Sequence, residues 1–310
     1  MVDKFVTDEK GDSVPMTAYI ALLRPQQWLK NMFVFLPLFF DGRLTDATCL
    51  VSAGIACASF CLAASSVYCI NDICDCEADR LHPLKCRRPI AAGKVGRRTG
   101  YALAFALLLV STALPALLPG GKETAWKMAA LVLSYYAMNI GYCFGLKRVA
   151  IVDVFIIAAG FVMRVVAGGF STHVHLTHWI ILMTFLLALF LAFAKRRDDV
   201  MIRQSTGVTV RSAAKQYTPD FLNQILAILA SVTIVCYIMY SVSDEVIVRM
   251  GSPYVYLTSV FVLAGIIRYL QITLVDGQSG SPTRILLKDR FIQACLALWI
   301  IGFLIIIYVL

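Results

Sequence analysis

Three polar side chains in the first third of the chain are spaced so that an α-helix would carry them on one face. Asn71, Asp75 and Asp79 stand four residues apart and follow a long run of mostly apolar residues. Amide and carboxylate oxygens, without histidines or paired thiolates, favour Mg²⁺ over Zn²⁺. Because Mg²⁺ commonly shares its ligand shell with substrate phosphates, the stretch predicts a metal site for a diphosphate substrate.

The segment that follows carries the opposite charge. Lys85, Arg87 and Arg88 come soon after the acids. Arginine suits bidentate contacts with phosphate oxygens, and lysine acts as a point charge. The alternative is an ordinary basic loop beside helix-end acids, but that alternative does not explain why three oxygen-bearing side chains share one face.

The composition is that of a polytopic membrane protein. Of 310 residues, 59% are hydrophobic and 15% are charged, against about 25% charged in soluble domains. Nine runs are long enough to span a bilayer, and they cover residues 16–40, 48–72, 99–119, 125–145, 149–171, 178–195, 221–243, 253–275 and 290–310. The polar stretch 24–28 interrupts the first run, which is therefore expected to begin as an interfacial segment.

The distribution of basic residues predicts the orientation. Most of the 28 Lys and Arg residues fall in segments that would share one side with the N-terminus, whereas only Arg43, Lys122, Lys127 and Arg249 fall on the other. The positive-inside rule then places the N-terminus, including a polar tail over residues 1–15, in the cytoplasm and the C-terminus outside. No cleaved signal peptide is indicated. The net charge of +9 favours anionic headgroups or phosphate substrates, and no nucleic acid partner is expected.

Further charged residues lie in or beside the predicted spans. Arg164 falls in the middle of a span, so it is expected to face a polar cavity or an acidic partner, with a structural ion pair as the alternative. Two other predicted cytoplasmic loops, 142–148 and 195–199, carry bases that suit phosphate oxygens. The second loop mixes three bases with two acids, and a solvated loop is the alternative there.

Cysteine and histidine offer two weaker alternatives for a metal site. The ten cysteines contain no CxxC pair and are interpreted as small buried residues. A thiolate site at Cys74, Cys76 and Cys86 fits no common zinc spacing. The three histidines of the stretch 172–178 are interpreted as solvated rather than as ligands.

The motif Asn71-Asp72-x-x-Asp75-x-x-x-Asp79 resembles the NDxxDxxxD signature of the UbiA superfamily of intramembrane prenyltransferases. The resemblance implies an all-α membrane protein with a nine-helix bundle around a central cavity open to the cytoplasmic side. It also implies one catalytic domain over residues 16–310, with Mg²⁺ holding a diphosphate substrate.

Within that superfamily the chain is more similar to the decaprenyl-phosphate phosphoribosyltransferase branch. The similarity lies in residues 24–31, 79–85, 88–93, 142–147, 164–169, 195–196 and 288–290. Members that use aromatic acceptors typically carry a second DxxxD motif after the sixth span, where this chain has Lys195-Arg196-Arg197-Asp198-Asp199. The branch has KRxxE there, so Asp199 stands where a glutamate would be.

The resemblance implies transfer of a 5-phosphoribosyl group from phosphoribosyl diphosphate to a polyprenyl phosphate, for donors of cell-wall arabinose. Asn71, Asp75 and Asp79 would hold Mg²⁺ with support from Asp72. The catalytic residues would be Asp75, Asp79, Lys147 and Arg164. The substrate-binding residues would be Arg24, Gln27, Lys30, Asn31, Asp72, Arg80, Lys85, Arg87, Arg88, Tyr142, Lys147, Lys195, Arg196 and Asp199.

Two other functions remain open at this point. A prenyltransferase that uses a prenyl diphosphate and an aromatic or glycerol-phosphate acceptor would share the first motif and the metal. A transporter or channel with an acidic mouth would move solutes without a covalent product. The enzyme is expected in the inner (plasma) membrane, and assembly as a homo-oligomer is left open.

Overall fold

The computed structural model describes residues 6–7, 13–14, 16–81, 85–206, 212–277 and 282–309, and it is almost wholly helical. The exception is a short antiparallel pair formed by β1 (Val6–Thr7) and β2 (Ser13–Val14), in which Val6 lies opposite Val14. The rest of the predicted tail 1–15 lies outside the described residues. The all-α class predicted from composition is confirmed.

The chain divides into two compact units. The first comprises Met1–Leu146 with Met163–His175, and the second comprises Lys147–Val162 with Leu176–Leu310. Helix α7 (Val152–Thr172) contributes residues to both.

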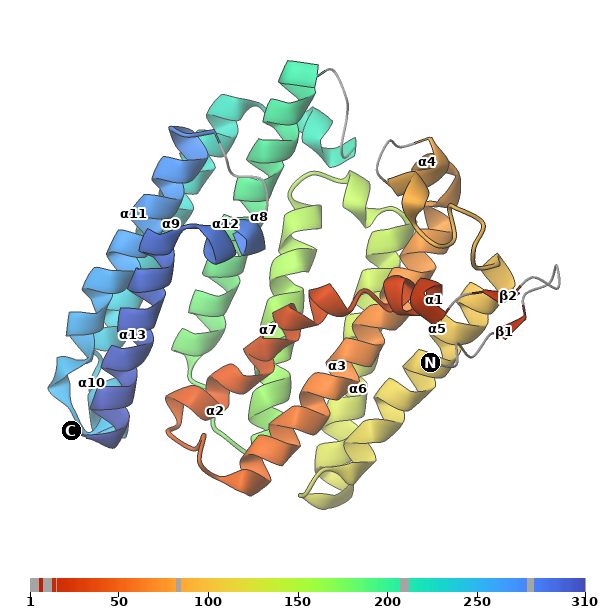
Figure 1. Ribbon diagram of the computed structural model, residues 1–310. Coiled ribbons are helices and arrows are strands. Elements are labelled where there is room, and N and C mark those ends of the chain that lie inside the picture. Colours follow the sequence, from red (N-terminus) through yellow and green to blue (C-terminus); the bar gives the residue numbers. More distant parts are fainter. Residues whose placement is uncertain are drawn as a thin grey trace. The chain divides into compact units, whose positions relative to one another are not determined.

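In the first unit α3 (Ala47–Cys74) packs against α5 (Arg97–Ala113) and α6 (Gly121–Phe144), as Figure 1 shows in orange and yellow. Small residues such as Ala56, Ser59 and Ala63 are fully buried in α3, which lets neighbouring helices approach closely. The unit also contains α4 (Cys76–Arg80), η2 (Lys85–Arg87) and η3 (Leu114–Leu117). Because α3 leads directly into α4, this packing positions the acidic motif.

The first predicted span, 16–40, is not one helix. It consists of α1 (Met16–Leu23), the 3₁₀ helix η1 (Pro25–Phe35) and α2 (Leu36–Phe40). Arg24 adopts a left-handed conformation with φ of 52°. Since the residue before a proline is disfavoured in the α region, α1 ends before Pro25.

In the second unit α8 (His178–Thr206) lies beside α9 (Pro219–Ser241), and α11 (Ser259–Leu274) lies beside α13 (Arg290–Tyr308) (Figure 1). Its shorter elements are η4 (Leu146–Arg148, whose first residue belongs to the first unit), η5 (Ser212–Gln216), α10 (Asp244–Met250), η6 (Pro253–Thr258) and α12 (Pro282–Lys288). The predicted loop at 195–199 is wrong, because α8 continues through these residues.

Within the described residues, seven helices are long and apolar enough to cross a membrane: Ala47–Cys74, Arg97–Leu117, Val152–Thr172, His178–Thr206, Pro219–Ser241, Pro253–Leu274 and Arg290–Tyr308. Helix α6 has 24 residues but is not among them, because Lys127, Asn139 and its tyrosines lower its hydropathy. The assignment as a polytopic membrane protein is confirmed. The count of nine spans and a cavity open to the cytoplasmic side stay predictions.

Candidate active site

The acidic motif lies where α3 ends and α4 begins. The predicted continuous helix is broken at Asp75, which caps α3. The backbone N–H of Asp75 nevertheless donates to the Asn71 carbonyl at 2.9 Å, and that of Asp79 donates to the Asp75 carbonyl at 2.8 Å. These i→i−4 bonds keep helical spacing across the break, as the prediction of a shared face requires.

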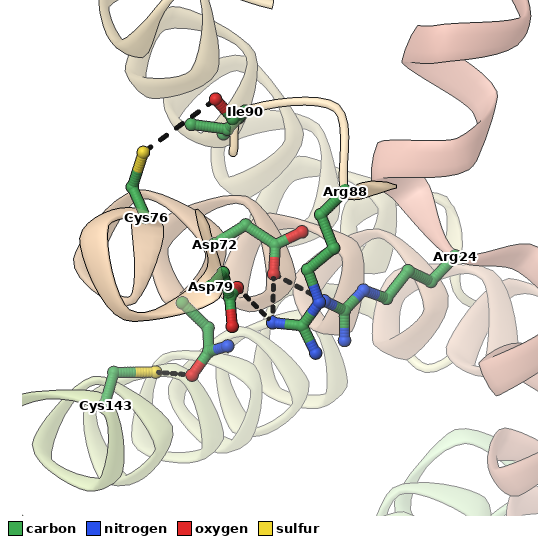
Figure 2. A network of polar contacts seen from close by, with 8 residues as sticks. Arg24, Asp72, Cys76, Asp79, Arg88, Ile90 and Cys143 are labelled. Atoms are coloured by element: carbon green, nitrogen blue, oxygen red, sulfur yellow. Dashed lines mark hydrogen bonds and ion pairs between the residues drawn. The ribbon is translucent and has the colours of Figure 1, made fainter. Parts of the chain in front are cut away.

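Two arginines converge on the acids of this motif (Figure 2). Arg88 Nη1 lies 2.6 Å from Asp79 Oδ2 and 3.1 Å from Asp72 Oδ1. Arg24 Nη2 pairs with the same Asp72 oxygen. The side chains of Asp72 and Asp79 are only 1% and 4% exposed, so these charges need partners nearby. The second oxygen of Asp72 is buried and has no hydrogen-bond partner in the described part of the chain.

Contacts with α3 hold Arg24 in place. Ser65 Oγ donates to the Leu23 carbonyl at 2.8 Å and accepts from Trp28 Nε1 at 3.0 Å. The chain on both sides of Arg24 is therefore fastened to α3. The Arg24 guanidinium lies 4.9 Å from the ring centre of Tyr68, which precedes Asp72 by one helical turn. This distance suits a cation–π contact.

The loop that carries Arg88 is fastened to α4. Cys76 Sγ donates to the Ile90 carbonyl at 3.8 Å, a contact that Figure 2 shows, and Arg80 Nε donates to the Ala91 carbonyl at 3.3 Å. The Arg88 backbone N–H also bonds the Lys85 carbonyl at 2.9 Å. Arg80, a predicted substrate-binding residue, thus contacts the loop backbone.

Asn71 has a partner that sequence reasoning missed. Cys143 Sγ on α6 donates to Asn71 Oδ1 at 3.6 Å (Figure 2). Cys143 is one of six buried cysteines; the prediction that all ten are buried is wrong for Cys74, which is exposed, and for Cys57, Cys86 and Cys236, which are half-buried. Nothing in the sequence context of Cys143 indicated a contact with the acidic motif. The neighbouring Tyr142 is half-buried.

A second polar cluster surrounds Arg164 deeper in the first unit. Arg164 Nε donates to Asn31 Oδ1 at 2.6 Å, and Nη2 donates to the Tyr135 hydroxyl at 3.0 Å. The guanidinium also lies 5.0 Å from the Tyr135 ring centre and 5.9 Å from that of Phe60. The structure thus gives this buried arginine a polar and aromatic environment, and it joins two predicted site residues, Asn31 and Arg164.

Gly168 allows α7 and η1 to approach closely enough for this cluster to form. A Cβ on Gly168 would lie 2.1 Å from the Val34 carbonyl oxygen, so α7 and η1 approach too closely for any side chain there. Arg164 precedes Gly168 by one turn, and Asn31 precedes Val34 by one 3₁₀ turn. The close approach therefore brings these two side chains within hydrogen-bond distance.

The second unit contains its own buried charge cluster. Arg196 Nε lies 2.5 Å from Asp153 Oδ2, and Nη1 lies 3.2 Å from Asp199 Oδ2. The Tyr217 hydroxyl donates to Asp153 Oδ1 at 3.4 Å and accepts from the Ile151 N–H at 2.5 Å. Burial raises the pKa of Tyr217, so its hydroxyl stays protonated and able to donate.

The structure brings predicted residues together in groups. Arg24, Asp72, Asp79 and Arg88 form one group, Asn31 and Arg164 another, and Arg196 and Asp199 a third. The other predicted residues are Gln27, Lys30, Asn71, Asp75, Arg80, Lys85, Arg87, Tyr142, Lys147 and Lys195; of these Lys30, Arg80 and Arg87 are exposed and the rest are half-buried. The contacts of Asp153 and Tyr135 with the arginines, and of Tyr217 with Asp153, were not predicted, because only folding brings these residues together.

Within the described ranges, the charged and sulfur-bearing side chains that commonly bind metals do not gather at one point. Among the described residues, no three His, Cys, Asp or Glu side chains form a group that could hold a metal ion. The thiolate and histidine alternatives therefore gain no support. Asn71, Asp75 and Asp79 include an amide and stay a predicted ligand set.

The model of the UbiA prenyltransferase family matches residues 32–288, which run through both units. The chain belongs to the UbiA prenyltransferase family. Among UbiA relatives, it is 33% identical over 295 residues to decaprenyl-phosphate phosphoribosyltransferase of Mycolicibacterium smegmatis, covering 92% of this chain and 91% of that protein. The enzyme of the same name from Corynebacterium glutamicum is 30% identical over 292 residues, covering 94% of this chain and 86% of that protein.

Solved structures agree on the UbiA fold. A UbiA homolog from Archaeoglobus fulgidus bound to DMAPP and Mg²⁺ superposes with a TM-score of 0.68 over 94% of this chain and 100% of that chain, at 22% identity. A likeness at this identity shows the fold alone. The chain is therefore a multi-pass membrane protein with the UbiA fold and a transferase of this family.

Proposed function

We propose that this transferase moves a 5-phosphoribosyl group from phosphoribosyl diphosphate to the phosphate of a polyprenyl phosphate of the decaprenyl type, releasing diphosphate. The observation that carries the proposal is similarity over more than nine-tenths of the chain to two enzymes named decaprenyl-phosphate phosphoribosyltransferase. The sequence at 195–199, which has bases where aromatic-acceptor members carry a second acidic motif, supports the same choice.

The residues of the acidic motif suit a magnesium ion. Asn71, Asp75 and Asp79 offer the hard oxygen donors that Mg²⁺ prefers, and helical hydrogen bonds link them across the break in α3. The buried Asp72 oxygen without a partner among the described residues suits a site that receives further positive charge or a donor group. When bound, the metal would neutralise charge on the departing diphosphate.

The basic residues would bind the phosphate groups of the two substrates. Lys85, Arg87 and Arg88 follow the acidic motif and would contact the diphosphate, and Lys147 and Lys195 are further candidates for the diphosphate and the 5-phosphate. The acceptor phosphate is ionised at neutral pH, so the reaction requires no strong general base.

Residues 24–31 of the first unit would hold the acceptor. Arg24, Gln27, Lys30 and Asn31 would position its phosphate while its apolar tail lies in the bilayer. Arg24 already reaches the acidic motif through Asp72, which supports a place for the acceptor phosphate near the departing diphosphate. Arg164 and Asp199 would complete the polar surroundings.

The distribution of Lys and Arg residues along the chain predicts how the enzyme lies in the membrane. We place the enzyme in the plasma (inner) membrane, with the N-terminus and the acidic motif on the cytoplasmic side, where the soluble donor would be found. The product would feed the synthesis of lipid-linked arabinose donors for a cell wall.

The alternative is prenyl transfer to an aromatic or glycerol-phosphate acceptor. Digeranylgeranylglyceryl phosphate synthase of Ignicoccus hospitalis is 29% identical over 233 residues, covering 71% of this chain and 69% of that enzyme. Purified enzyme with Mg²⁺, phosphoribosyl diphosphate and polyprenyl phosphate should form a lipid product that is heavier than polyprenyl phosphate by one phosphoribosyl group. Turnover of a prenyl diphosphate, with none of phosphoribosyl diphosphate, would favour the alternative.

A further inference from the structure

One nitrogen of Arg88 joins the two buried carboxylates of the acidic motif. Arg88 Nη1 lies 2.6 Å from Asp79 Oδ2 and 3.1 Å from Asp72 Oδ1 (Figure 2). We infer that Arg88 competes with the metal ion for Asp79, and that it exchanges this carboxylate for a substrate phosphate when metal and diphosphate bind together. The inference rests on the proposed function for the place of the metal at Asp79.

The charge balance gives the first reason for competition. Asp72 and Asp79 carry two negative charges, and Arg24 and Arg88 carry two positive charges in contact with them. These four side chains are therefore neutral together. A divalent cation added beside both arginines would bring two positive charges, of which the Asp75 carboxylate would offset one, to a place where the Asp72 and Asp79 side chains are 1% and 4% exposed. Uncompensated charge in such a weakly solvated place is costly.

The contact distance gives the second reason. At 2.6 Å from Arg88 Nη1, Asp79 Oδ2 already accepts a short charge-assisted hydrogen bond. A metal ion bound to the same carboxylate would sit beside the guanidinium as a like charge. The metal must therefore displace Arg88 from Asp79 or bind with a lower affinity.

Arg88 is the arginine that can move. Arg24 is fastened on both sides through Ser65 and stacks on Tyr68 at 4.9 Å. The backbone of the Arg88 loop is also held to α4, but the Arg88 side chain itself is 24% exposed, against 18% for Arg24, and extends from a loop. Asp72 can keep its bond to the guanidinium while the bond to Asp79 breaks, so Asp72 would act as the fixed partner.

This exchange would couple metal and diphosphate binding. Metal alone has to break the Arg88–Asp79 pair, and the freed guanidinium gains no new anionic partner. A metal–diphosphate complex brings phosphate oxygens that replace Asp79 as the partner of Arg88. The enzyme would therefore bind Mg²⁺ weakly by itself and more tightly with a diphosphate.

The test measures Mg²⁺ binding to the full-length protein in detergent, by calorimetric titration without any diphosphate. Arg88→Gln should tighten Mg²⁺ binding about tenfold, a typical size for coupling between two ligands. Arg97→Gln is the matched control, because it removes the same charge nearby but from a residue whose ion pair is with Glu77 and whose side chain is 51% exposed. Its affinity should stay within about twofold of wild type.

Unchanged or weaker Mg²⁺ binding by Arg88→Gln, or no binding by either protein, would overturn the inference. A second measurement uses only wild-type protein, in case the variant does not fold. Mg²⁺ should raise the rate at which phenylglyoxal modifies Arg88 but not Arg97, as read by peptide mass spectrometry; protection of Arg88 would contradict the exchange. Neither experiment contains phosphoribosyl diphosphate, so failure here leaves the proposed reaction to its own assay.

Discussion

At the scale of single residues, the acidic motif contains two kinds of aspartate. Asp72 and Asp79 are buried and paired with arginines, whereas Asp75 is half-buried at the break between two helices. Helical hydrogen bonds link Asp75 to both Asn71 and Asp79, the other members of the proposed ligand set. The geometry therefore singles out Asp75 as the most direct test of the proposed ligand set.

Asp75→Asn keeps the size of the side chain and removes one charge from the proposed metal site. We expect kcat/KM to fall about a hundredfold, with a higher Mg²⁺ concentration needed for half-maximal rate, because charge stabilisation at the leaving group is lost. Glu77→Gln is the control, since Glu77 is exposed and pairs with Arg80 and Arg97. Near-wild-type activity of Asp75→Asn at saturating Mg²⁺ would argue against ligation by Asp75.

At the scale of elements, one close helix contact determines whether Arg164 reaches its partners. Gly168 on α7 faces the Val34 carbonyl of η1, and no Cβ fits between them. Position 168 does not accept a side chain, because the neighbouring atom is a backbone oxygen and cannot move aside as a flexible side chain could. An intramembrane arginine is acceptable here because this approach supplies it with Asn31 and Tyr135.

Gly168→Ala should therefore separate α7 from η1 and weaken the Arg164–Asn31 bond. We expect a lower thermal unfolding midpoint in detergent and a marked loss of activity, since overpacking typically costs about 1–3 kcal/mol. Gly54→Ala is the matched control, because a Cβ there meets nothing within 4 Å. If both variants unfold at the same temperature as wild type, the close approach of α7 and η1 at Gly168 does not contribute to stability.

At the scale of the whole molecule, the chain contains two compact units, and each has a buried polar centre of its own. In the second unit Arg196, one of the largest fully buried side chains, pairs with both Asp153 and Asp199. Both Arg196 and Asp199 lie within α8, in the stretch predicted to be a loop. These ion pairs give Arg196 and Asp199 a structural task whether or not they also contact substrate.

Asp153→Asn should destabilise the protein by about 1.5–3 kcal/mol, because it weakens a buried charge-assisted hydrogen bond while Asp199 still balances the charge of Arg196. Tyr217→Phe should cost less, about 1 kcal/mol, because it removes only a hydroxyl from the same cluster. Thermal unfolding in detergent measures both. Glu123→Gln, which breaks an exposed pair with Lys127 at 2.6 Å, should unfold near the wild-type temperature. The reverse order of effects would show that Asp153 does not stabilise the unit.

The sequence by itself determined the membrane class, the helical composition and the family, because hydropathy and the spacing of the acidic motif are local properties of the chain. It also identified Arg164 as a residue that needs polar surroundings, since charge in a span is costly whatever its neighbours are.

Only the tertiary structure decided which groups meet. Arg24 and Arg88 converge on Asp72, Cys143 reaches Asn71, and Asp153 pairs with Arg196. These residues are separated by 16 to 72 positions along the chain. No local pattern encodes such pairs, because they depend on how helices pack and on where a proline or a glycine lets the backbone turn or approach. The acidic motif was visible as a candidate metal site, and its arginine partners became visible only after folding.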